Sequence, residues 1–391
     1  MTVRVCHVIT NLDVGGAESM LLRLLERLDR RRWSSRVVSL VDDGRTAGRI
    51  RDLGIPVLPI GMRRGLLPGP LATWQLVRAI REAEPDLIQT WLYHANLLGG
   101  LASRFCRPPV PVLWNLRMLA PQACHTVKAS TRWAAAACAR LSSRLPAEII
   151  ANSQAVKASH VELGIATDRI RVIRNGFDPE RFAPSPAARR RLGREFGVAD
   201  DVRLVGMAGR WDPLKDFETF LTAAGRLVNR CRDVRFVLCG QRLDEHNSKL
   251  LSAVARSGAA GRVHLLGRRD DMPSLHAALD VAVLASHSEG LPNVIGEAMA
   301  CGVPCVVTDA GGSAELVGDE GRIVPVGDAD ALANSIGSLL ELSPDDRGRV
   351  GAEARARIIE HFSLDGMVAQ YERVWDEVLA GTPENVVRRA A

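Results

Sequence analysis

The stretch VAVLASHSEGLPNVIGEAMACGVPCVVTD, residues 281–309, contains the pattern from which the fold class is predicted. Residues 281–286 and 305–309 are mostly apolar, as in strands of a parallel sheet, and residues 293–300 between them have the composition of a helix. Pro292 suits the first turn of that helix, where its missing N–H costs nothing. Two strands joined by a helix form the β-α-β unit from which parallel sheets are built.

The same alternation of strand and helix patterns extends along the whole chain of 391 residues. Strands are expected at 3–10, 35–40, 56–60, 86–91, 111–116, 148–153, 170–176, 202–209, 234–240, 263–267, 281–286 and 305–309. Helices are expected between them, for example at 18–28, 217–228 and 245–255. This length exceeds one hydrophobic core, so we predict an α/β fold of two Rossmann-like, doubly wound domains facing across a cleft. Ligands of such sheets bind at their carboxyl edges.

The domain border is expected in FDPERFAPSPAARRRLGREFG, residues 177–197, which is rich in proline and charge and is interpreted as a linker. We therefore predict an N-terminal domain of residues 1–183 and a C-terminal domain of residues 184–362. Residues 363–381 form an amphipathic helix that we expect to pack back on the first domain. Its apolar side carries Met367, Tyr371, Val374 and Val378.

Composition and charge indicate an ordinary globular protein with one strongly basic half. Hydrophobic residues make up 47% and charged residues 25% of the chain. The start, MTVRVCHVIT, lacks the apolar core of a secretory signal, and polar residues interrupt the uncharged run at 87–103, so we expect a cytoplasmic protein without a membrane span. Residues 1–184 carry 26 basic and 15 acidic side chains, whereas the remainder carries 25 and 30. The first half should attract an anionic partner.

The basic half contains a long interval, between Asp86 and Glu148, without any acidic residue. In its segment 126–144, cations at multiples of four residues follow one side of a predicted helix, next to Trp133. These cations are Lys128, Arg132, Arg140 and Arg144. The pattern predicts peripheral contact of segment 104–144 with anionic lipid at the inner face of the plasma membrane, the alternative being a domain helix with solvated arginines. Nucleic acid is not expected as a partner, because aromatic residues are 4% and no recognition motif accompanies the charge.

A glycine pair, Gly15 and Gly16, follows the first predicted strand and opens a helix. Glycine lets the backbone approach a ligand, and the free N–H groups of the helix start favour an anion or a sugar hydroxyl. An ordinary turn between strand and helix explains the pair equally well. The spacing is not that of the Gly-x-Gly-x-x-Gly dinucleotide fingerprint, which disfavours a nicotinamide dehydrogenase.

Two cations, Arg210 and Lys215, flank a turn at the end of the strand predicted at 202–209. Two fixed positive charges at a sheet edge suit a diphosphate leaving group, whose developing charge they stabilise. The alternative is a solvated loop in which Arg210 or Lys215 forms a salt bridge with Asp212 or Asp216.

Two carboxylates, Glu289 and Glu297, stand eight residues apart on the turn and helix of the opening stretch. Gly290 and the N–H groups after Pro292 can face an anion. A carboxylate accepts from two adjacent hydroxyls, which is the chemistry of ribose and hexose recognition. The alternative for a glutamate near a helix start is favourable interaction with the helix dipole.

Together these residues carry a resemblance that covers essentially the whole chain. The glycine pair, Arg210 with Lys215, and EGLPNVIGEAMACGVPCVVTDAGGSAELV resemble family 4 of the retaining glycosyltransferases, which have the GT-B fold. The spacing of Glu289 and Glu297 matches the Glu-x7-Glu motif of that family, and NGFDPERF at 175–182 resembles the stretch leading into its interdomain linker.

The resemblance implies a role for each candidate residue. Glu289 would contact the donor sugar and Glu297 the ribose of the nucleotide, while Arg210 and Lys215 would hold the diphosphate. Gly15 and Gly16 would approach donor phosphate or sugar, in a first domain that binds the acceptor. The second domain would bind the nucleotide sugar, and further residues assigned to that site are Gly290, Leu291, Pro292, Asn293 and Arg268.

His94, in WLYHANLLGG, would be the active-site histidine of the first domain, although a structural histidine is the alternative. Leu291–Pro292 departs from the aromatic–glycine pair often found after the first glutamate of the motif. This departure removes one backbone donor to the ligand and leaves the sugar preference open.

The sequence thus predicts a retaining hexosyltransferase that uses a UDP-sugar or GDP-sugar and a glycan or lipid-linked hydroxyl acceptor in bacterial polysaccharide, lipopolysaccharide or lipid-linked glycan synthesis. No cofactor and no metal are expected, because the loop cations supply positive charge. Asp328 in the DAD string at 328–330 is interpreted as a helix N-cap. A sugar-nucleotide epimerase of the same fold and a non-catalytic subunit of a glycan assembly complex are the alternatives.

Overall fold

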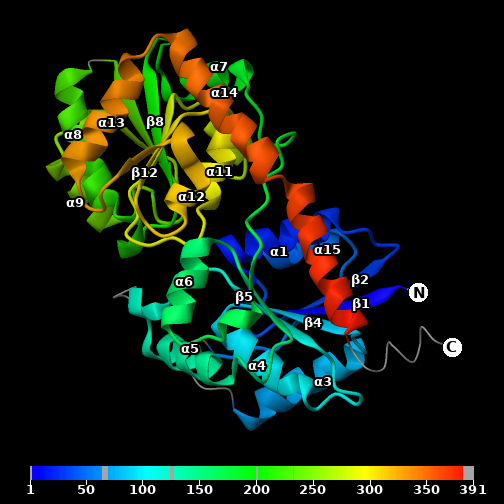
Figure 1. The fold of residues 1–391 in the computed structure, drawn as a ribbon. Helices are drawn as coiled ribbons and strands as arrows, with labels where there is room; N and C mark the ends of the chain where they lie inside the picture. Colours follow the sequence, from blue (N-terminus) through cyan, green and yellow to red (C-terminus); the bar gives the residue numbers. More distant parts are fainter. Residues whose placement is uncertain (1, 64–68, 124–126, 200, 232, 382–391) are drawn as a thin grey trace. The chain divides into compact units, whose positions relative to one another are not determined.

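The computed structural model describes residues 2–63, 69–123, 127–199, 201–231 and 233–381 (Figure 1). The chain forms two compact units. One contains the chain up to Gly176 together with the part from Leu364 onward, and the other is Phe177–Ser363. In the described residues, none of the helices is both long and apolar enough to cross a bilayer.

The first unit is built on a seven-stranded sheet in the order β3-β2-β1-β4-β5-β6-β7, with all neighbouring strands parallel. The strands are β1 Val3–Ile9, β2 Trp33–Ser39, β3 Val57–Pro59, β4 Leu87–Trp91, β5 Val112–Leu116, β6 Glu148–Ala151 and β7 Ile170–Val172. The order reverses between β1 and β4, so the loops that follow these two strands diverge and leave space at the carboxyl edge.

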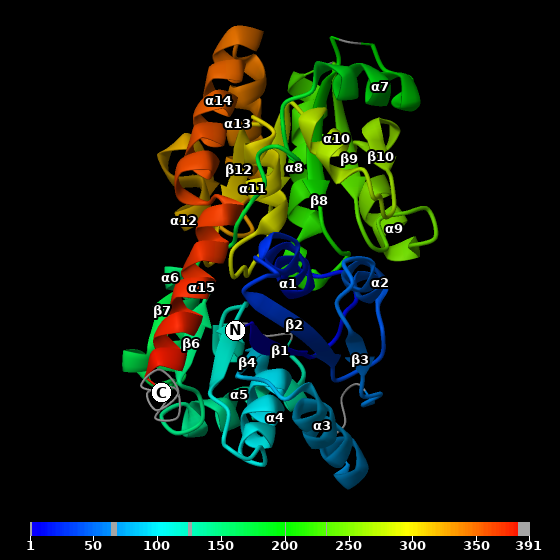
Figure 2. The same cartoon turned by 90° about the vertical axis from the view of Figure 1, so that its right-hand side faces the viewer.

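Helices cover both faces of this sheet (Figures 1 and 2). On one face, α1 (Gly16–Arg27), α2 (Arg45–Asp52) and α15 (Leu364–Ala380) contribute to one hydrophobic core. On the other face lie α3 Pro70–Ala83, α4 Tyr93–Ser103, α5 Ala129–Leu141 and α6 Gln154–Glu162. Short 3-10 turns occur at Pro121–Ala123 and Thr167–Arg169.

The second unit has a six-stranded parallel sheet in the order β10-β9-β8-β11-β12-β13, which reverses between β8 and β11. Its strands are β8 Arg203–Ala208, β9 Val234–Cys239, β10 Val263–Leu265, β11 Val281–Leu284, β12 Cys305–Thr308 and β13 Arg322–Val324. Its helices are α7 Pro186–Phe196, α8 Phe217–Arg230, α9 Ser248–Arg256, α10 Met272–Ala277, α11 Asn293–Ala300, α12 Ser313–Val317, α13 Ala329–Glu341 and α14 Pro344–His361. Helices α8, α9 and α13 cover one face, and the others pack on the opposite face.

The prediction of two Rossmann-like parallel sheets is confirmed, and all twelve predicted strands are present. The sequence missed β13, a three-residue edge strand in which Arg322 and Ile323 are exposed. A strand that is short and exposed lacks the apolar run by which buried strands are recognised.

The predicted linker is wrong, because residues 177–197 are structured parts of the second unit. Phe177 and Phe182 are buried in its core, so the chain passes between the units at Gly176 rather than at residue 183. Pro186 and the charged run from Arg189 to Glu195 belong to α7, Pro186–Phe196. Its N-cap is Ser185, whose Oγ accepts from the backbone N–H of Ala188, and Gly197 ends it at a φ of 65°.

The C-terminal helix α15 packs within the first unit. Tyr371 and Trp375 are fully buried, and the Trp375 ring meets the Trp33 ring edge-on at 5.0 Å. The Trp375 indole N–H donates to Gln89 Oε1 at 3.0 Å, so both the apolar and the polar part of this side chain are satisfied.

Candidate functional site

The strongest cluster of candidate residues lies in the second unit, in the loops after β8 and β11. These two strands are neighbours at the point where the strand order reverses. In open α/β sheets, ligands bind outside the carboxyl ends of the strands at this point, because the following loops diverge. The loop after β8 carries Arg210 and Lys215, and the loop after β11 carries Glu289.

Lys215 and Glu289 form a direct, largely buried ion pair. The distance from Lys215 Nζ to Glu289 Oε1 is 2.5 Å, and the two side chains are 24% and 11% exposed. Ser286 Oγ donates to the same Oε1 at 2.7 Å, and the Ser286 carbonyl accepts from Thr308 Oγ1 at 2.6 Å. The fold therefore brings two of the predicted site residues together and holds the carboxylate through the strand ends below it.

The two loops are also bonded to each other. Asp216, at a φ of 47°, caps α8 by accepting from the Thr219 N–H, and its other oxygen lies 3.3 Å from His287 Nε2. The His287 backbone N–H donates to the Leu214 carbonyl at 2.8 Å. These bonds on both sides of Lys215 restrict the loop from which it extends.

Arg210 does not share this arrangement. Its Nη2 and Nε donate to Asp212 Oδ2 at 3.0 and 3.3 Å, and the side chain is 55% exposed. This is the salt bridge that the sequence left open as the alternative. Asp212 also caps the 3-10 turn at Pro213–Lys215 by accepting from the Leu214 N–H.

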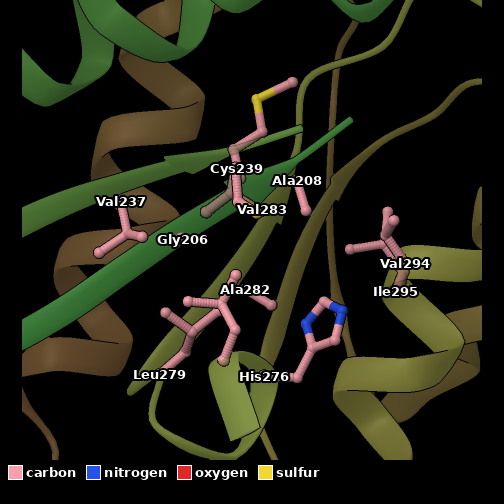
Figure 3. Close-up of a pocket in the computed structure, with 12 residues that line it drawn as sticks. Gly206, Ala208, Val237, Cys239, His276, Leu279, Ala282, Val283, Val294 and Ile295 are labelled. Carbon is pink, nitrogen blue, oxygen red and sulfur yellow. The ribbon is translucent and has the colours of Figure 1, made fainter. Parts of the chain in front are cut away.

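Helix α11 has the predicted bounds, but Pro292 is its N-cap rather than part of its first turn. Glu297 is buried on this helix, and its Oε2 lies 3.4 Å from Nε2 of the buried His276 on α10. The His276 ring extends between β-strand residues and the start of α11, beside a cavity of about 10 Å³ (Figure 3). Such a volume holds about one water molecule. The Glu297 carboxylate thus lies next to a histidine side chain of the same unit.

The other residues assigned to the nucleotide-sugar site lie in loops of the second unit. Gly290, Leu291 and Pro292 are buried in the turn before α11, and Asn293 is half-buried at the helix start. Arg268 is half-buried in the loop after β10. The predicted cap at Asp328 is confirmed, since its Oδ1 accepts from the N–H groups of Asp330 and Ala331 at the start of α13.

In the first unit, Gly15 is the extended N-cap of α1 and Gly16 its first residue. A Cβ atom at Gly15 would lie 2.3 Å from an oxygen of Glu18, whose side chain is buried over this position. Glu18 stands in the first turn of the helix, where a carboxylate interacts favourably with the helix dipole. A side chain at Gly15 would therefore require the Glu18 carboxylate to move.

His94 is the second residue of α4, and burial lowers the pKa of its imidazole, which is neutral at pH 7. The preceding N-cap, Leu92, has a φ of 72°, a costly conformation for a branched side chain and one found preferentially at functional sites. The Asn96 side chain holds the same helix start by donating to the Asn115 carbonyl at 3.2 Å.

Tyr93, next to His94, is fixed by a buried histidine. His160 Nδ1 donates to the Val156 carbonyl at 2.7 Å, so its Nε2 accepts from the Tyr93 hydroxyl at 2.5 Å. Burial lowers the pKa of His160 to about 4, which keeps this ring neutral and the tautomer defined. The first turn of α4 is thereby fixed next to His94.

The sequence missed Ser286, Asp216, His287, His276 and the pair of Tyr93 and His160. Ser286 was detectable, because it ends a predicted strand three residues before Glu289. The other contacts join elements distant in sequence, and no spacing rule indicates them.

Two family models match the chain, one described as Glycosyltransferase Family 4 over residues 14–181 and one as Glycosyl transferases group 1 over residues 202–342. With its two parallel α/β units, the chain has the GT-B architecture of nucleotide-sugar transferases. It belongs to the group 1, family 4 glycosyltransferases.

Among curated relatives, the chain is 30% identical to N-acetyl-alpha-D-glucosaminyl L-malate synthase of Bacillus anthracis, over 48% of this chain and 49% of that protein. It is 28% identical to the UDP-Gal:alpha-D-GlcNAc-diphosphoundecaprenol alpha-1,3-galactosyltransferase of Escherichia coli, over 67% and 68% of the two chains. It is also 28% identical to a GDP-mannose-dependent alpha-mannosyltransferase of Mycobacterium tuberculosis, over 93% and 94%. The chain thus spans about half of the first relative and most of the third.

Among solved structures, HepE of Anabaena in complex with UDP-glucose superposes with a TM-score of 0.84 at 27% identity, covering 96% of this chain and 99% of that chain. WaaG, a glycosyltransferase involved in lipopolysaccharide biosynthesis, superposes with a TM-score of 0.74 at 16% identity, covering 95% and 99%, and at that identity shows the fold alone.

Proposed function

We propose that this chain transfers a hexose from a UDP-sugar or GDP-sugar to a hydroxyl group of a glycan or lipid-linked acceptor, with retention at the anomeric carbon. The galactosyl and mannosyl transfers for which two relatives are named, and the UDP-glucose complex of HepE, support the donor class. We also propose that the reaction takes place at the inner face of the plasma membrane, because the first half of the chain is strongly basic and its acid-free interval suits an anionic surface.

The observation that carries this proposal is the Lys215–Glu289 pair where the strand order of the second unit reverses. A donor diphosphate brings at least two negative charges and competes with Glu289 for the Lys215 ammonium. When Lys215 turns to phosphate, Glu289 is left with the Ser286 hydroxyl and accepts from the sugar instead. Before the donor binds, the ion pair thus keeps Lys215 and Glu289 in the positions from which they would contact the diphosphate and the sugar.

In this mechanism, Lys215 stabilises the charge that develops on the departing diphosphate. Arg210 assists through guanidinium N–H groups that Asp212 does not occupy, since both bonds to Asp212 come from Nε and Nη2. Because these cations neutralise the leaving group, we propose that no metal is required. Glu297, buried beside His276, is assigned to the ribose.

Retention is proposed to occur without a protein nucleophile. Retaining hydrolases use two carboxyl groups about 5 Å apart and a covalent intermediate. Here Glu289 is assigned to the donor sugar and Glu297, beside His276, to the ribose, so neither carboxylate is proposed as a nucleophile. The acceptor hydroxyl instead attacks from the face that the diphosphate leaves and transfers its proton to the departing diphosphate oxygen as the bond to that oxygen breaks. The neutral His94 imidazole is suited to bind the acceptor hydroxyl.

The test is a thermal-shift screen of the whole chain against UDP- and GDP-sugars, in the presence and absence of EDTA. The stabilising donors then enter transfer assays in which NMR reports the anomeric configuration of the product. We expect stabilisation by one donor class, unchanged by EDTA, and a product of retained configuration. An inverted product contradicts the mechanism. An altered sugar stereocentre without transfer identifies an epimerase, and the absence of stabilisation by any donor removes the proposal.

A further inference from the structure

Helix α5 of the first unit carries an exposed basic face with a tryptophan on it. Arg132 and Arg140 lie on the helix, Lys128 is its N-cap and Arg144 lies in the turn that follows it, and all four are exposed. None of the four lies within ion-pair distance of an acidic side chain in the part of the chain that the structure describes. Trp133 is 54% exposed and stands seven residues, or two helical turns, before Arg140, so both emerge along one line of the helix.

The end of α4 extends this face. Arg104, just after α4, donates from Nη2 to the Arg144 carbonyl at 2.5 Å, so the ends of the two neighbouring helices meet (Figure 1). Phe105 is 56% exposed at this junction, and Leu101 and Arg107 are also exposed. We call the resulting surface the α4–α5 face. It consists of Leu101, Arg104, Phe105, Arg107, Lys128, Arg132, Trp133, Arg140 and Arg144.

We propose that the α4–α5 face docks on an anionic lipid bilayer. The face combines six cations with three exposed apolar side chains, and the sequence places no acidic residue between Asp86 and Glu148. Cations attract the anionic headgroups over a Debye length, and Trp and Phe insert at the level of the headgroups, where an apolar ring meets a polar boundary. An acidic protein or a nucleic acid would also be attracted by the cations, but it would gain less binding energy than a bilayer from the exposed rings of Phe105 and Trp133.

This proposal deepens the membrane location proposed above by naming the surface that binds the bilayer. It rests on the proposed function in that docking would bring the enzyme to a lipid-linked acceptor. Docking itself is measured without turnover. Failure of donor binding with normal vesicle binding therefore contradicts the proposed sugar transfer alone. The reverse result contradicts docking and the proposed membrane location and leaves the proposed sugar transfer standing.

The first unit also provides a matched control on α3. Trp74 is 57% exposed and has the Arg78 guanidinium 5.5 Å from its ring centroid, which repeats the combination of tryptophan and arginine. Here, however, Arg78 Nε is 2.6 Å from Glu82 Oε1. The same residue types are present, but the charge is neutralised.

The first experiment is sedimentation of the full chain with vesicles of equal parts phosphatidylglycerol and phosphatidylcholine, and with vesicles of phosphatidylcholine alone. We expect binding to the anionic vesicles at about 0.1 M salt and loss of binding near 1 M, where the Debye length falls to about 3 Å. The triple variant R132Q/R140Q/R144Q should bind roughly 100-fold more weakly, from about fivefold for each charge removed. The control variant W74A/R78Q should bind like the unmodified chain.

The second experiment locates the tryptophan. Brominated lipid should quench part of the fluorescence of the bound chain, and this quenching should be lost in W133F and kept in W74F. Circular dichroism and the thermal midpoint of each variant verify that it is folded. Equal binding to neutral and anionic vesicles overturns the proposal. So does equal weakening by the α3 control, unchanged quenching in W133F, or displacement of the chain from vesicles by duplex RNA bound to the same face.

Discussion

The site of the second unit and the α4–α5 face of the first unit are both rich in cations, but they hold them in opposite ways. At the site, Lys215 is paired with Glu289 and Arg210 with Asp212, so each cation has an acidic partner at ion-pair distance. On the α4–α5 face, the cations have no acidic neighbour among the described residues. Paired charges favour the exchange of one partner for a shaped ligand, whereas unpaired charges attract an extended surface at a distance.

The largest expected effect comes from removing the cation of the paired site. Lys215→Ala should lower kcat/KM by about 10²- to 10³-fold, because the developing charge on the leaving group loses a preorganised donor. Steady-state transfer assays measure this loss. The matched control is Lys249→Ala, a lysine on α9 in the same unit, which should transfer sugar at an unchanged rate. Equal activity of the two variants would show that the Lys215–Glu289 pair is only structural.

Removing the acid of the same pair should separate diphosphate binding from sugar transfer. In Glu289→Gln, Lys215 loses its ion pair and is available to phosphate, while the sugar loses its charged acceptor. We expect kcat/KM to fall by about 10²-fold, whereas the free nucleoside diphosphate binds about as tightly as before or tighter. Isothermal titration calorimetry and transfer assays give the two numbers. Parallel loss of both would contradict the exchange of partners at Lys215.

We expect low pH to destabilise the two units to different extents, because their buried histidines differ. In the first unit, burial lowers the pKa of His7 to about 3 and of His160 to about 4, both from 6.5. Below pH 6.5 these histidines bind protons in the unfolded chain but stay neutral in the folded chain. Their contribution to the free energy of unfolding is therefore present at pH 7 and is lost as pH falls toward 4. For His160 the loss approaches about 3 kcal/mol.

Hydrogen exchange with mass spectrometry between pH 7 and pH 4 measures this loss in each unit separately. We expect the first unit to lose protection before the second, in which burial lowers the pKa of the half-buried His264. His160→Gln should reduce the acid sensitivity of the first unit. Earlier loss of protection in the second unit would mean that these histidines do not control acid unfolding.

The smallest expected effect concerns His94. Tyr93→Phe keeps the ring but removes the hydroxyl that donates to His160, leaving a buried nitrogen without a partner, at a cost of about 1 kcal/mol. If this bond positions the first turn of α4, kcat should fall several-fold while KM for the donor stays constant. Measuring both parameters, with His160→Phe in the Tyr93→Phe background as a double-mutant test, distinguishes positioning from general destabilisation. Unchanged kcat in a destabilised variant would assign the bond to stability alone.

Much of the fold follows from the sequence because its signals are local. Buried strands are apolar runs, and α11 follows from Pro292 and the composition after it. The cap at Asp328 depends on contacts within three residues. The linker was misassigned because proline and charge mark the start of an exposed helix as well as a flexible segment. Only packing distinguishes the two, here through Phe177 and Phe182.

The candidate site is predictable in its residues but less so in their partners. The loop positions of Lys215 and Glu289 follow from strand ends that share one sheet edge, and the structure joins them. The pairing of Arg210 with Asp212 and the contact between Glu297 and His276 depend on rotamers and on packing between α10 and α11. Sequence patterns cannot predict these side-chain contacts, because they do not report distances between side chains in space.

The place of α15 in the first unit has a consequence for biosynthesis. The core around Trp33 includes Tyr371 and Trp375, so segments that precede and follow the second unit in the sequence complete one hydrophobic core. The segment between them, Phe177–Ser363, is continuous and emerges from the ribosome intact. The second unit therefore has all its residues available before the first unit, whose core keeps an open apolar face until α15 has been synthesised.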